Sequence, residues 1–457
     1  MGFITDNQTL EDLKLIGRAG APSIFGLFNR TATRGGAELL EELFRYPLSD
    51  PEAINGRVAR IRRFAAEKTV FPFDAELFDI AEQYLSATDE RTKLAPEEHS
   101  LGGKISQLIG ADTEFQEISK GVGAIARIGR ELRAFIGDGP AMGRSSGRMA
   151  HDGSGAVAHD DPRELIALLA DPDLAAIWAE RPDARLPYAK VAAYDLLLRF
   201  RHRDAIRRIL RYIYRMDAYI SVAKVATERG FCFPEALSGG RQGLGLEGLY
   251  HPELKQPVPN TLRLTEDENV LFLTGANMAG KSTFMKSLGI AVYLGHMGFP
   301  VPASAMVFSV FDGLYTTINL PDDLGTGTSH FYAEVLRVKK VARELGAGKN
   351  LFVIFDELFR GTNVKDACEA TIAITSAFAR RRRSLFVVST HIMEAGDVLR
   401  ENCPSVSFQY LPTLLKGNTP VYTYTLEKGI TADRHGMVII RNEGILDILK
   451  NGKKPAS

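Results

Sequence analysis

The sequence has 457 residues, of which 45% are hydrophobic and 25% are charged. This composition is that of an ordinary globular protein of two or three domains, and it excludes a disordered, collagen-like or purely coiled-coil chain. Lys and Arg number 56, as do Asp and Glu, so any binding to nucleic acid or anionic lipid must come from a local patch and not from net charge.

Cysteine usage and hydropathy narrow the cellular setting. Cys232, Cys368 and Cys403 are far apart and show no CxxC spacing, which argues against a disulfide framework and a structural zinc site. Residues 1–6 contain no basic segment followed by an apolar run, so they do not read as a secretory signal. The longest apolar window, 290–311, is interrupted by a histidine and two prolines and cannot span a bilayer. We therefore expect a cytoplasmic protein without a membrane partner.

The two halves of the chain differ in pattern. Over residues 1–235, apolar residues recur at helical spacing, as at Ile54, Val58 and Ile61, which predicts an all-α domain. A Gly- and Ser-rich stretch at about 137–161 predicts a flexible linker inside it. Over residues 236–457, short apolar strands alternate with helices, which predicts an α/β domain with a buried, largely parallel sheet. The expected strands are 270–274, 351–355 and 385–389, and the expected helices include 282–294 and 330–345.

Arginines recur every four residues near the end of the helical half. In a helix they form a cationic face opposite an apolar seam of Ile206, Ile209, Leu210 and Ile213. The candidate phosphate-contacting residues on this face are Arg203, Arg207, Arg211 and Arg215. Two interpretations stay open: a solvated helix face, or a surface that grips DNA phosphates.

A phosphate-binding loop follows the first predicted strand of the second half. Two glycines, a lysine and a serine have the P-loop spacing, in the order strand, loop and helix. The predicted nucleotide-binding residues are Gly275, Ala276, Asn277, Met278, Ala279, Gly280, Lys281, Ser282 and Thr283. The loop amides and the helix N-terminus would hold phosphates, Lys281 would reach the β- and γ-phosphates, and Ser282 would bind Mg²⁺. A turn that merely uses glycine is the alternative.

Acidic residues end the next predicted strand. Asp356 follows an apolar run and is placed to orient Mg²⁺, and Glu357 after it is placed to act as general base on the attacking water. Alternatively, Glu357 is a sheet-end acid neutralised by Arg360. His391 follows the third strand, where a γ-phosphate sensor would lie, although histidines at such positions are often structural.

These motifs together resemble the ATPase domain of the MutS family, the DNA mismatch-repair ATPases related to ABC-type ATPases. The family sequences TGPNMGGKST, DExGRGTSTxDG and ATH correspond to residues 274–283, 356–367 and 389–391. Residues 250–260 resemble the family's approach to this domain, and residues 31–57 resemble the start of its helical core, or lever. The resemblance implies a P-loop NTPase of the ABC-related type that binds ATP and Mg²⁺, preceded by a helical lever. The chain also departs from the family: because the lever-like segment starts within the first few dozen residues, we expect the mismatch-recognition domain of the family to be lacking.

A further family motif, DLxxGxSTFxxE, is similar to residues 323–334. In the family, the matching serine caps a helix that faces the nucleotide of the partner subunit. The resemblance thus implies a homodimer with composite ATP sites, completed by Ser329 of the second copy. An ordinary helix N-cap is the alternative for Ser329.

Two functions remain open on the sequence. The first is an ATP-gated DNA-binding ATPase acting in repair or recombination, with repair proteins as partners. The second is a nucleotide-switched ATPase that grips a protein and never contacts DNA.

Overall fold

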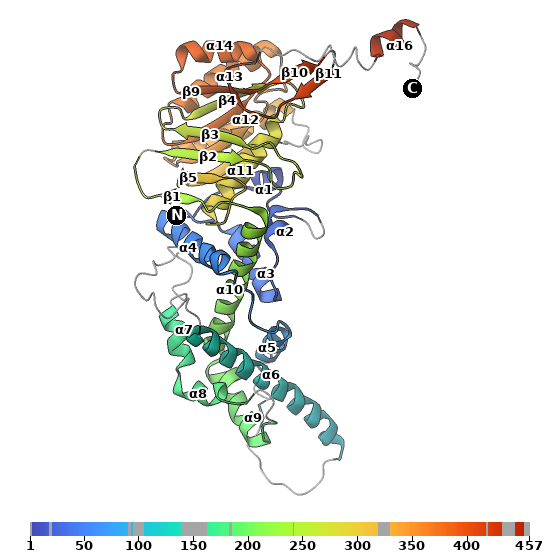
Figure 1. Cartoon of the computed structure of the whole chain (residues 1–457), viewed down its shortest axis with the longest axis vertical. Helices are drawn as coiled ribbons and strands as arrows, with labels where there is room; N and C mark the ends of the chain where they lie inside the picture. The colour runs from blue at the N-terminus through green and yellow to red at the C-terminus, as the bar shows by residue number, and fades with distance from the viewer. Residues whose placement is uncertain are drawn as a thin grey trace. The chain divides into compact units, whose positions relative to one another are not determined.

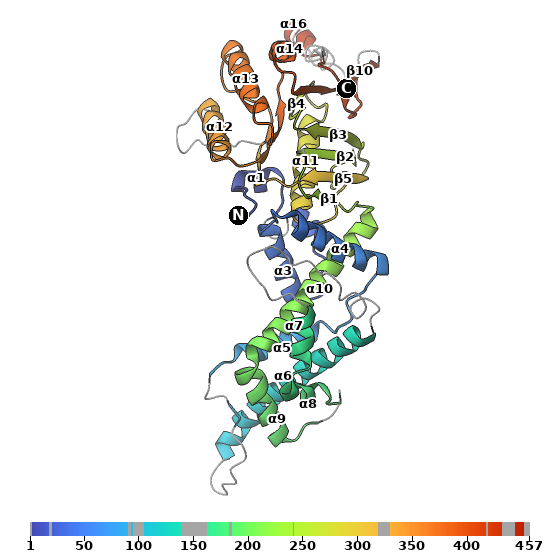
Figure 2. The same ribbon diagram turned by 90° about the vertical axis from the view of Figure 1, so that its left-hand side faces the viewer.

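The computed structural model describes residues 2–17, 21–89, 93–94, 105–138, 162–181, 185–240, 242–318, 330–416, 419–431 and 444–451. These residues divide into two compact units (Figures 1 and 2). The first comprises residues 1–26, 46–58 and 226–457, and the second comprises residues 27–45 and 59–225. Within the described ranges, no helix is long and apolar enough to cross a membrane. All but the first two residues of the predicted 137–161 linker lie outside the described residues, and those two belong to helix α6.

The second unit is helical. Its elements are α3 (Arg34–Arg45), α5 (Glu76–Ser86), α6 (Ile105–Asp138), α7 (Pro162–Leu169), α8 (Pro172–Trp178), α9 (Tyr188–Asp195) and the π-helix η2 (Leu196–Arg201). Three further helices cross the division between the units: α2 (Ile24–Phe28), α4 (Pro51–Glu67) and α10 (Arg203–Arg229). Apolar side chains from α5, α6, α8, η2 and α10 form one buried core. The helical pattern predicted for this part of the chain is confirmed.

The first unit is a mixed α/β structure. Its strands are β1 (Glu235–Leu237), β2 (Gly243–Leu249), β3 (Asn260–Thr265), β4 (Val270–Gly275), β5 (Ala305–Ser309), β6 (Gly313–Thr317), β7 (Leu351–Phe355), β8 (Leu385–Ser389), β9 (Val406–Leu411), β10 (Thr413–Lys416), β11 (Thr419–Tyr422) and β12 (Glu427–Lys428). Its helices are α1 (Asn7–Asp12), α11 (Lys281–His296), α12 (His330–Gly346), α13 (Val364–Ala379), α14 (Met393–Asn402) and α16 (Ile445–Asn451).

The larger sheet has the order β12-β9-β4-β8-β7-β6. The four pairings from β9 to β6 are parallel, and only β12 pairs in the antiparallel direction. Strands β4, β6, β7 and β8 are buried along their whole length, which explains their uninterrupted apolar sequences. A smaller sheet has the order β1-β5-β2-β3. The predicted α/β class and the three predicted strands are confirmed.

Helix α11 lies between the two sheets and contacts β2 of one and β4 and β6 of the other (Figure 2). Almost every residue of the helix after Thr283 is buried. Glycines allow the close packing: a Cβ on Gly289 would lie 2.8 Å from Leu13, and one on Gly295 would lie 2.9 Å from Met306. The helix that leaves the phosphate loop is therefore a fixed part of the core.

Segment 4–12 covers the outer side of edge strand β6, and Ile4 forms a parallel bridge with Gly313. The amides of Leu314, Thr316 and Ile318 donate to Ile4 O at 3.0 Å, Thr9 Oγ1 at 3.0 Å and Asp12 Oδ2 at 2.8 Å. The carbonyls of Asp312, Leu314 and Thr316 accept from Ile4 N at 2.8 Å, Thr5 Oγ1 at 3.1 Å and Arg337 Nη2 at 2.7 Å. Main-chain and side-chain groups together thus form hydrogen bonds with the amides and carbonyls on the open edge of β6.

Candidate nucleotide-binding site

Three neighbouring parallel strands bring the predicted site residues together. Because β8 lies between β4 and β7 in the sheet, the loops that follow these strands meet at one edge. The phosphate loop follows β4, the pair Asp356–Glu357 follows β7, and His391 lies in the loop after β8. The carboxyl edge of a parallel sheet is the usual place for a ligand in such folds.

The phosphate loop has the backbone that its glycines permit. Gly280 has φ of +100° and forms the N-cap of α11. Residues that carry a Cβ rarely adopt this backbone conformation. Met278 also has a positive φ, of +69°, and its side chain is exposed. The loop therefore reverses tightly between β4 and α11 and places the helix N-terminus, with its partial positive charge, at the opening.

Lys281 is folded onto the loop. Its side chain is only 6% exposed, and Nζ donates to the carbonyls of Gly275 at 2.8 Å and Ala276 at 3.2 Å. Burial lowers the pKa of Lys281, while Asp356 and Glu357 oppose that shift. An ammonium held by neutral carbonyls in a partly desolvated place is a group that an anion would stabilise.

Ser282 and Asp356 are in contact. Ser282 Oγ donates to Asp356 Oδ2 at 2.5 Å, and burial raises the pKa of this carboxyl group while the serine bond lowers it. Among the described residues, Asp356 Oδ1 is buried without a hydrogen-bond partner. An orphaned carboxylate oxygen beside a hydroxyl is a hard-oxygen donor set that suits Mg²⁺. The residues present therefore fit the predicted cation.

Glu357 is paired with an imidazole and a guanidinium group. Its Oε1 lies 2.9 Å from His391 Nε2, and its Oε2 lies 3.6 Å from Arg360 Nη1. The hydrogen bond with His391, with the charges of His391 and Arg360, lowers the pKa of Glu357 to about 2. Glu357 also has a positive φ of +54°, which is strained for a glutamate. The structure thus brings together the predicted base and the predicted sensor, and it also contains the neutralising contact with Arg360.

A cavity of about 540 Å³ opens above the loop. All predicted loop residues from Ala276 to Thr283 line it, together with Glu357, and Gly275 is buried at the end of β4. The other wall comes from segments remote in sequence: Leu249, Tyr250, His251, Leu254, Gln256, Pro257, Val258, Asn260, Leu411 and Tyr424. The volume is within the range of small-molecule sites.

Tyr424 is a lining residue that the sequence analysis missed. A Cβ on Gly280 would lie 3.0 Å from Tyr424 Cδ1, so the tyrosine ring lies against the phosphate loop. Asn260 holds this segment: its Nδ2 donates to Tyr424 O at 2.9 Å, and its Oδ1 accepts from Leu426 N at 2.7 Å. No motif marks Tyr424, because its position depends on a partner 164 residues earlier in the chain.

Phe359, which stands where the family has a glycine, is buried and has an apolar partner. Its ring centroid lies 5.9 Å from that of Phe331 at the start of α12. A Cβ on Gly361 would lie 2.6 Å from Phe331 N. The start of α12 therefore packs directly against the segment that follows Glu357. Ser329 lies outside the described residues.

The arginine face of α10 is only partly available. Arg203 Nε donates to Leu85 O at 3.0 Å, and Arg211 Nη2 pairs with Glu42 at 2.9 Å. Arg207 is exposed, and Arg215 is partly buried and interacts within the protein. Intramolecular bonds thus engage most of the four side chains predicted to contact phosphate.

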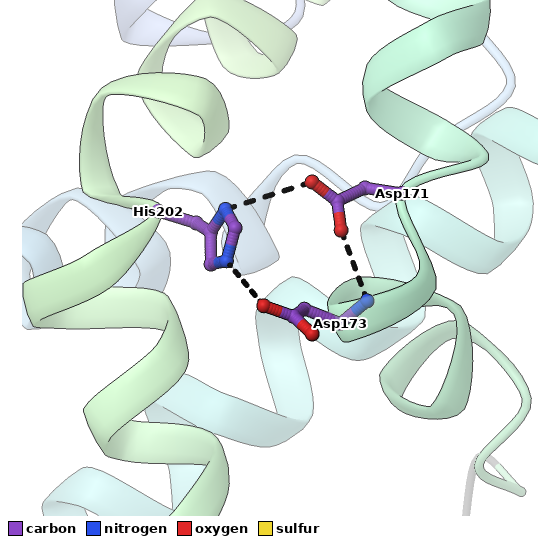
Figure 3. A group of neighbouring side chains, drawn as sticks. All are labelled: Asp171, Asp173 and His202. Atoms are coloured by element: carbon purple, nitrogen blue, oxygen red, sulfur yellow. Dashed lines mark hydrogen bonds and ion pairs between the residues drawn. The ribbon is translucent and has the colours of Figure 1, made fainter.

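A second group of possible metal ligands lies in the helical unit (Figure 3). Asp171, Asp173 and His202 have one ligand atom each within 4.8 Å of one another. However, His202 Nδ1 faces Asp171 at 3.7 Å, and Nε2 faces Asp173 at 3.2 Å. Because one ion can bind only one nitrogen of an imidazole ring, this arrangement favours direct contact of His202 with the two carboxylates at the start of α8, where Asp171 is the N-cap.

Comparison with known proteins agrees with the site. The family profile described as MutS domain V matches residues 271–454. The DNA mismatch repair protein MutS of Symbiobacterium thermophilum is 32% identical over 264 residues, which are 55% of this chain and 30% of the relative. That of Persephonella marina is 28% identical over 265 residues, or 56% and 30%, and that of Fusobacterium nucleatum is 27% identical over 250 residues, or 53% and 27%.

The matched part is thus less than a third of the length of each relative. The profile match covers the phosphate loop, the acidic strand end and the histidine whose geometry is described above. The order of the motifs in the sequence, the parallel sheet and the profile match all indicate the same kind of domain, an ATPase domain of the MutS type. Residues 271–454 thus match the profile of MutS domain V, which is an ATPase domain, and about half of the chain is similar to the MutS relatives.

Proposed function

We propose that this MutS-type ATPase hydrolyses ATP with Mg²⁺ in the cavity above the phosphate loop. The loop amides, the N-terminus of α11 and Lys281 would bind the phosphates, and Lys281 would exchange its bonds to the Gly275 and Ala276 carbonyls for phosphate oxygens. Ser282 and Asp356 would hold Mg²⁺, which neutralises charge on the transferring phosphoryl group when bound. The observation that carries the proposal is the orphaned Asp356 oxygen next to Ser282, one residue away from Glu357.

Glu357 would accept the proton of the attacking water. With a pKa of about 2, a carboxylate is a poor base near neutral pH. It becomes more basic when His391 leaves it, because the hydrogen bond with His391 is the largest cause of the low pKa. We therefore assign to His391 two alternative partners, Glu357 in the resting site and the γ-phosphate in the loaded one.

The test is ATP turnover by the Lys281→Ala variant, which should lose hydrolysis. Lys286→Ala is a matched control, because Lys286 lies on the same helix α11 outside the cavity lining and should turn over ATP like the wild type. Wild-type turnover by Lys281→Ala would refute the site assignment.

We further propose a homodimer in which Ser329 of each copy completes the ATP site of the other. The family resemblance of residues 323–334 supports this proposal. Size-exclusion chromatography with light scattering, with and without ATP in the Glu357→Gln variant, measures the association. A monomer under all nucleotide conditions would contradict it.

For the output of the cycle we propose ATP-gated DNA binding in repair or recombination, supported by the names of the matched relatives. On the arginine face of α10, Arg207 is exposed and is the first residue to test, whereas Arg211 must first leave Glu42. Anisotropy on mismatched, branched and plain duplexes over a salt series should show affinity that falls with salt, and less steeply in Arg207→Ala. Absence of binding to every duplex would favour the alternative, an ATPase that grips a protein partner.

A further inference from the structure

Ser389 and Asp356 are neighbours at the ends of two paired strands. Strands β7 and β8 are parallel, and Phe355 and Val388 are their last paired residues. Continuing this register by one residue places Asp356 next to Ser389. The two chains stay together beyond the strands, because Leu358 N donates to Ser389 O at 3.3 Å.

Both side chains lie on the face of the sheet that α11 covers. Phe355 and Val388 pack in a core with apolar residues of α12, α13 and α14. Because successive side chains of a strand alternate between the two faces of a sheet, the next residues, Asp356 and Ser389, point to the opposite face. The contact of Asp356 with Ser282 on α11 agrees with this orientation.

Each of the two residues has a buried oxygen atom that lacks a partner. In the part of the chain that the structure describes, Ser389 Oγ and Asp356 Oδ1 are buried and make no hydrogen bond. One of these atoms carries a proton to donate, and the other is an acceptor. Burial raises the pKa of Asp356, whereas the hydroxyl groups of Ser282 and Ser389 lower it. The Ser389 hydroxyl is therefore close enough to favour the charged carboxylate, without a hydrogen bond of ordinary geometry.

Ser389 is also a departure from the family motif ATH, which has alanine at this position. Alanine would avoid the unpaired hydroxyl, whose burial disfavours the folded state. A serine at this position therefore calls for a partner in another state of the site. Asp356 Oδ1 is the nearest candidate acceptor that this geometry provides. Because a carboxylate oxygen has two lone pairs, Oδ1 can accept from a hydroxyl and bind a cation at the same time.

We propose that Ser389 is a positioning residue for the divalent cation: when nucleotide and cation are bound, its hydroxyl donates to Asp356 Oδ1 and fixes the carboxylate that Ser282 contacts through Oδ2. This inference rests on the proposed ATP and Mg²⁺ site. Hydrogen bonds to a metal ligand orient that ligand and raise the affinity for the metal. Ser389 touches neither nucleotide nor cation in this scheme. Its loss should therefore weaken Mg²⁺ binding and leave the affinity for nucleotide alone unchanged.

The experiment measures the affinity of the full chain for a fluorescent ATP analogue, in EDTA and in saturating Mg²⁺. The ratio of the two dissociation constants is the gain in affinity that the cation provides. In Ser389→Ala we expect the wild-type affinity in EDTA and a gain that is smaller by about tenfold, or ~1.4 kcal/mol. An unchanged gain would overturn the role of Ser389, and so would an equal loss of affinity in EDTA and in Mg²⁺.

Ser384→Ala is the matched control, because Ser384 is a buried serine directly before the other end of β8. Its Oγ accepts from Leu351 N at 3.0 Å. Loss of this bond should lower the melting temperature of the ligand-free protein and leave the Mg²⁺ gain at the wild-type value. Ser389→Ala should show the reverse pattern, with a melting temperature at or above that of the wild type, since it removes an unpaired hydroxyl. A lower melting temperature with an intact gain would assign a purely structural role to Ser389 and overturn the proposal.

Ser389→Cys separates the hydrogen bond from the volume of the side chain, because a thiol is only a weak donor. This variant should lose the Mg²⁺ gain as Ser389→Ala does, and a wild-type gain would contradict the proposal. The wild type separates this inference from the proposed function. If it binds the analogue without any gain from Mg²⁺, the cation site fails and the role of Ser389 fails with it. If it shows the gain and Ser389→Ala keeps it, only the role of Ser389 fails.

Discussion

The position of Tyr424 predicts how the site holds the part of the nucleotide beyond the phosphates. Its ring lies against Gly280 and lines the cavity, and the residue is 45% exposed, so part of the side chain is accessible to a planar ligand. Stacking of a base on an aromatic side chain contributes about 1–3 kcal/mol. Since Tyr424 is half exposed, the lower end applies, and Tyr424→Ala should weaken ATP binding by about 1 kcal/mol, or roughly fivefold.

The assay is competition of ATP and of inorganic tripolyphosphate against a fluorescent nucleotide. Tyr424→Ala should bind ATP more weakly but tripolyphosphate as the wild type does, because the phosphate loop is unchanged. Tyr424→Phe should keep ATP affinity, since the ring remains. Unchanged ATP affinity in Tyr424→Ala, or a matching loss for tripolyphosphate, would refute the stacking role.

Three other predictions concern the divalent cation, the pairing of Glu357 and the helical unit. Chelation of divalent cations should abolish turnover. Asp356→Asn should lower kcat by about a hundredfold, because it removes several kcal/mol of metal-assisted stabilisation of the transition state. A turnover rate that does not depend on divalent cations would contradict this prediction. Because the pKa of Glu357 is depressed from 4.5 to about 2, its pairing stabilises the fold fully above pH 4.5 and less as pH falls toward 2. In thermal unfolding, the wild type should therefore be more stable than Glu357→Gln by about 1 kcal/mol near neutral pH, after allowance for solvent screening. This difference in the free energy of unfolding should shrink as the pH falls. A difference that does not change with pH would count against the pairing. Gly129→Ala should destabilise the helical unit by about 1–3 kcal/mol, because its Cβ would lie 2.2 Å from the buried Trp178 ring. Gly123→Ala on the same helix, with open space around it, should be neutral or stabilising in the same melts.

Local patterns predicted the parts of the site that are local. The phosphate loop, Asp356 and the strands around them follow from short apolar runs and fixed spacings, because strand, loop and helix are consecutive in the sequence. Features that depend on remote partners were not predictable. Arg211 looked free until the fold brought Glu42 from 169 residues away, and the contact of Asp6 with Arg337 spans 331 residues. The spacing of the arginines predicts a cationic helix face, but it does not predict which of these charges are neutralised by acidic residues elsewhere in the chain.

The treatment of the two sheet margins bears on self-association. An uncovered β-strand is a template for pairing with another chain, which leads to aggregation. One margin of the larger sheet is occupied by residues 4–12, and the other ends in β12, a two-residue strand with exposed, charged side chains. Without residues 4–12 the β6 edge would be open to pairing with another chain, so protection of this margin depends on contacts between segments some 300 residues apart.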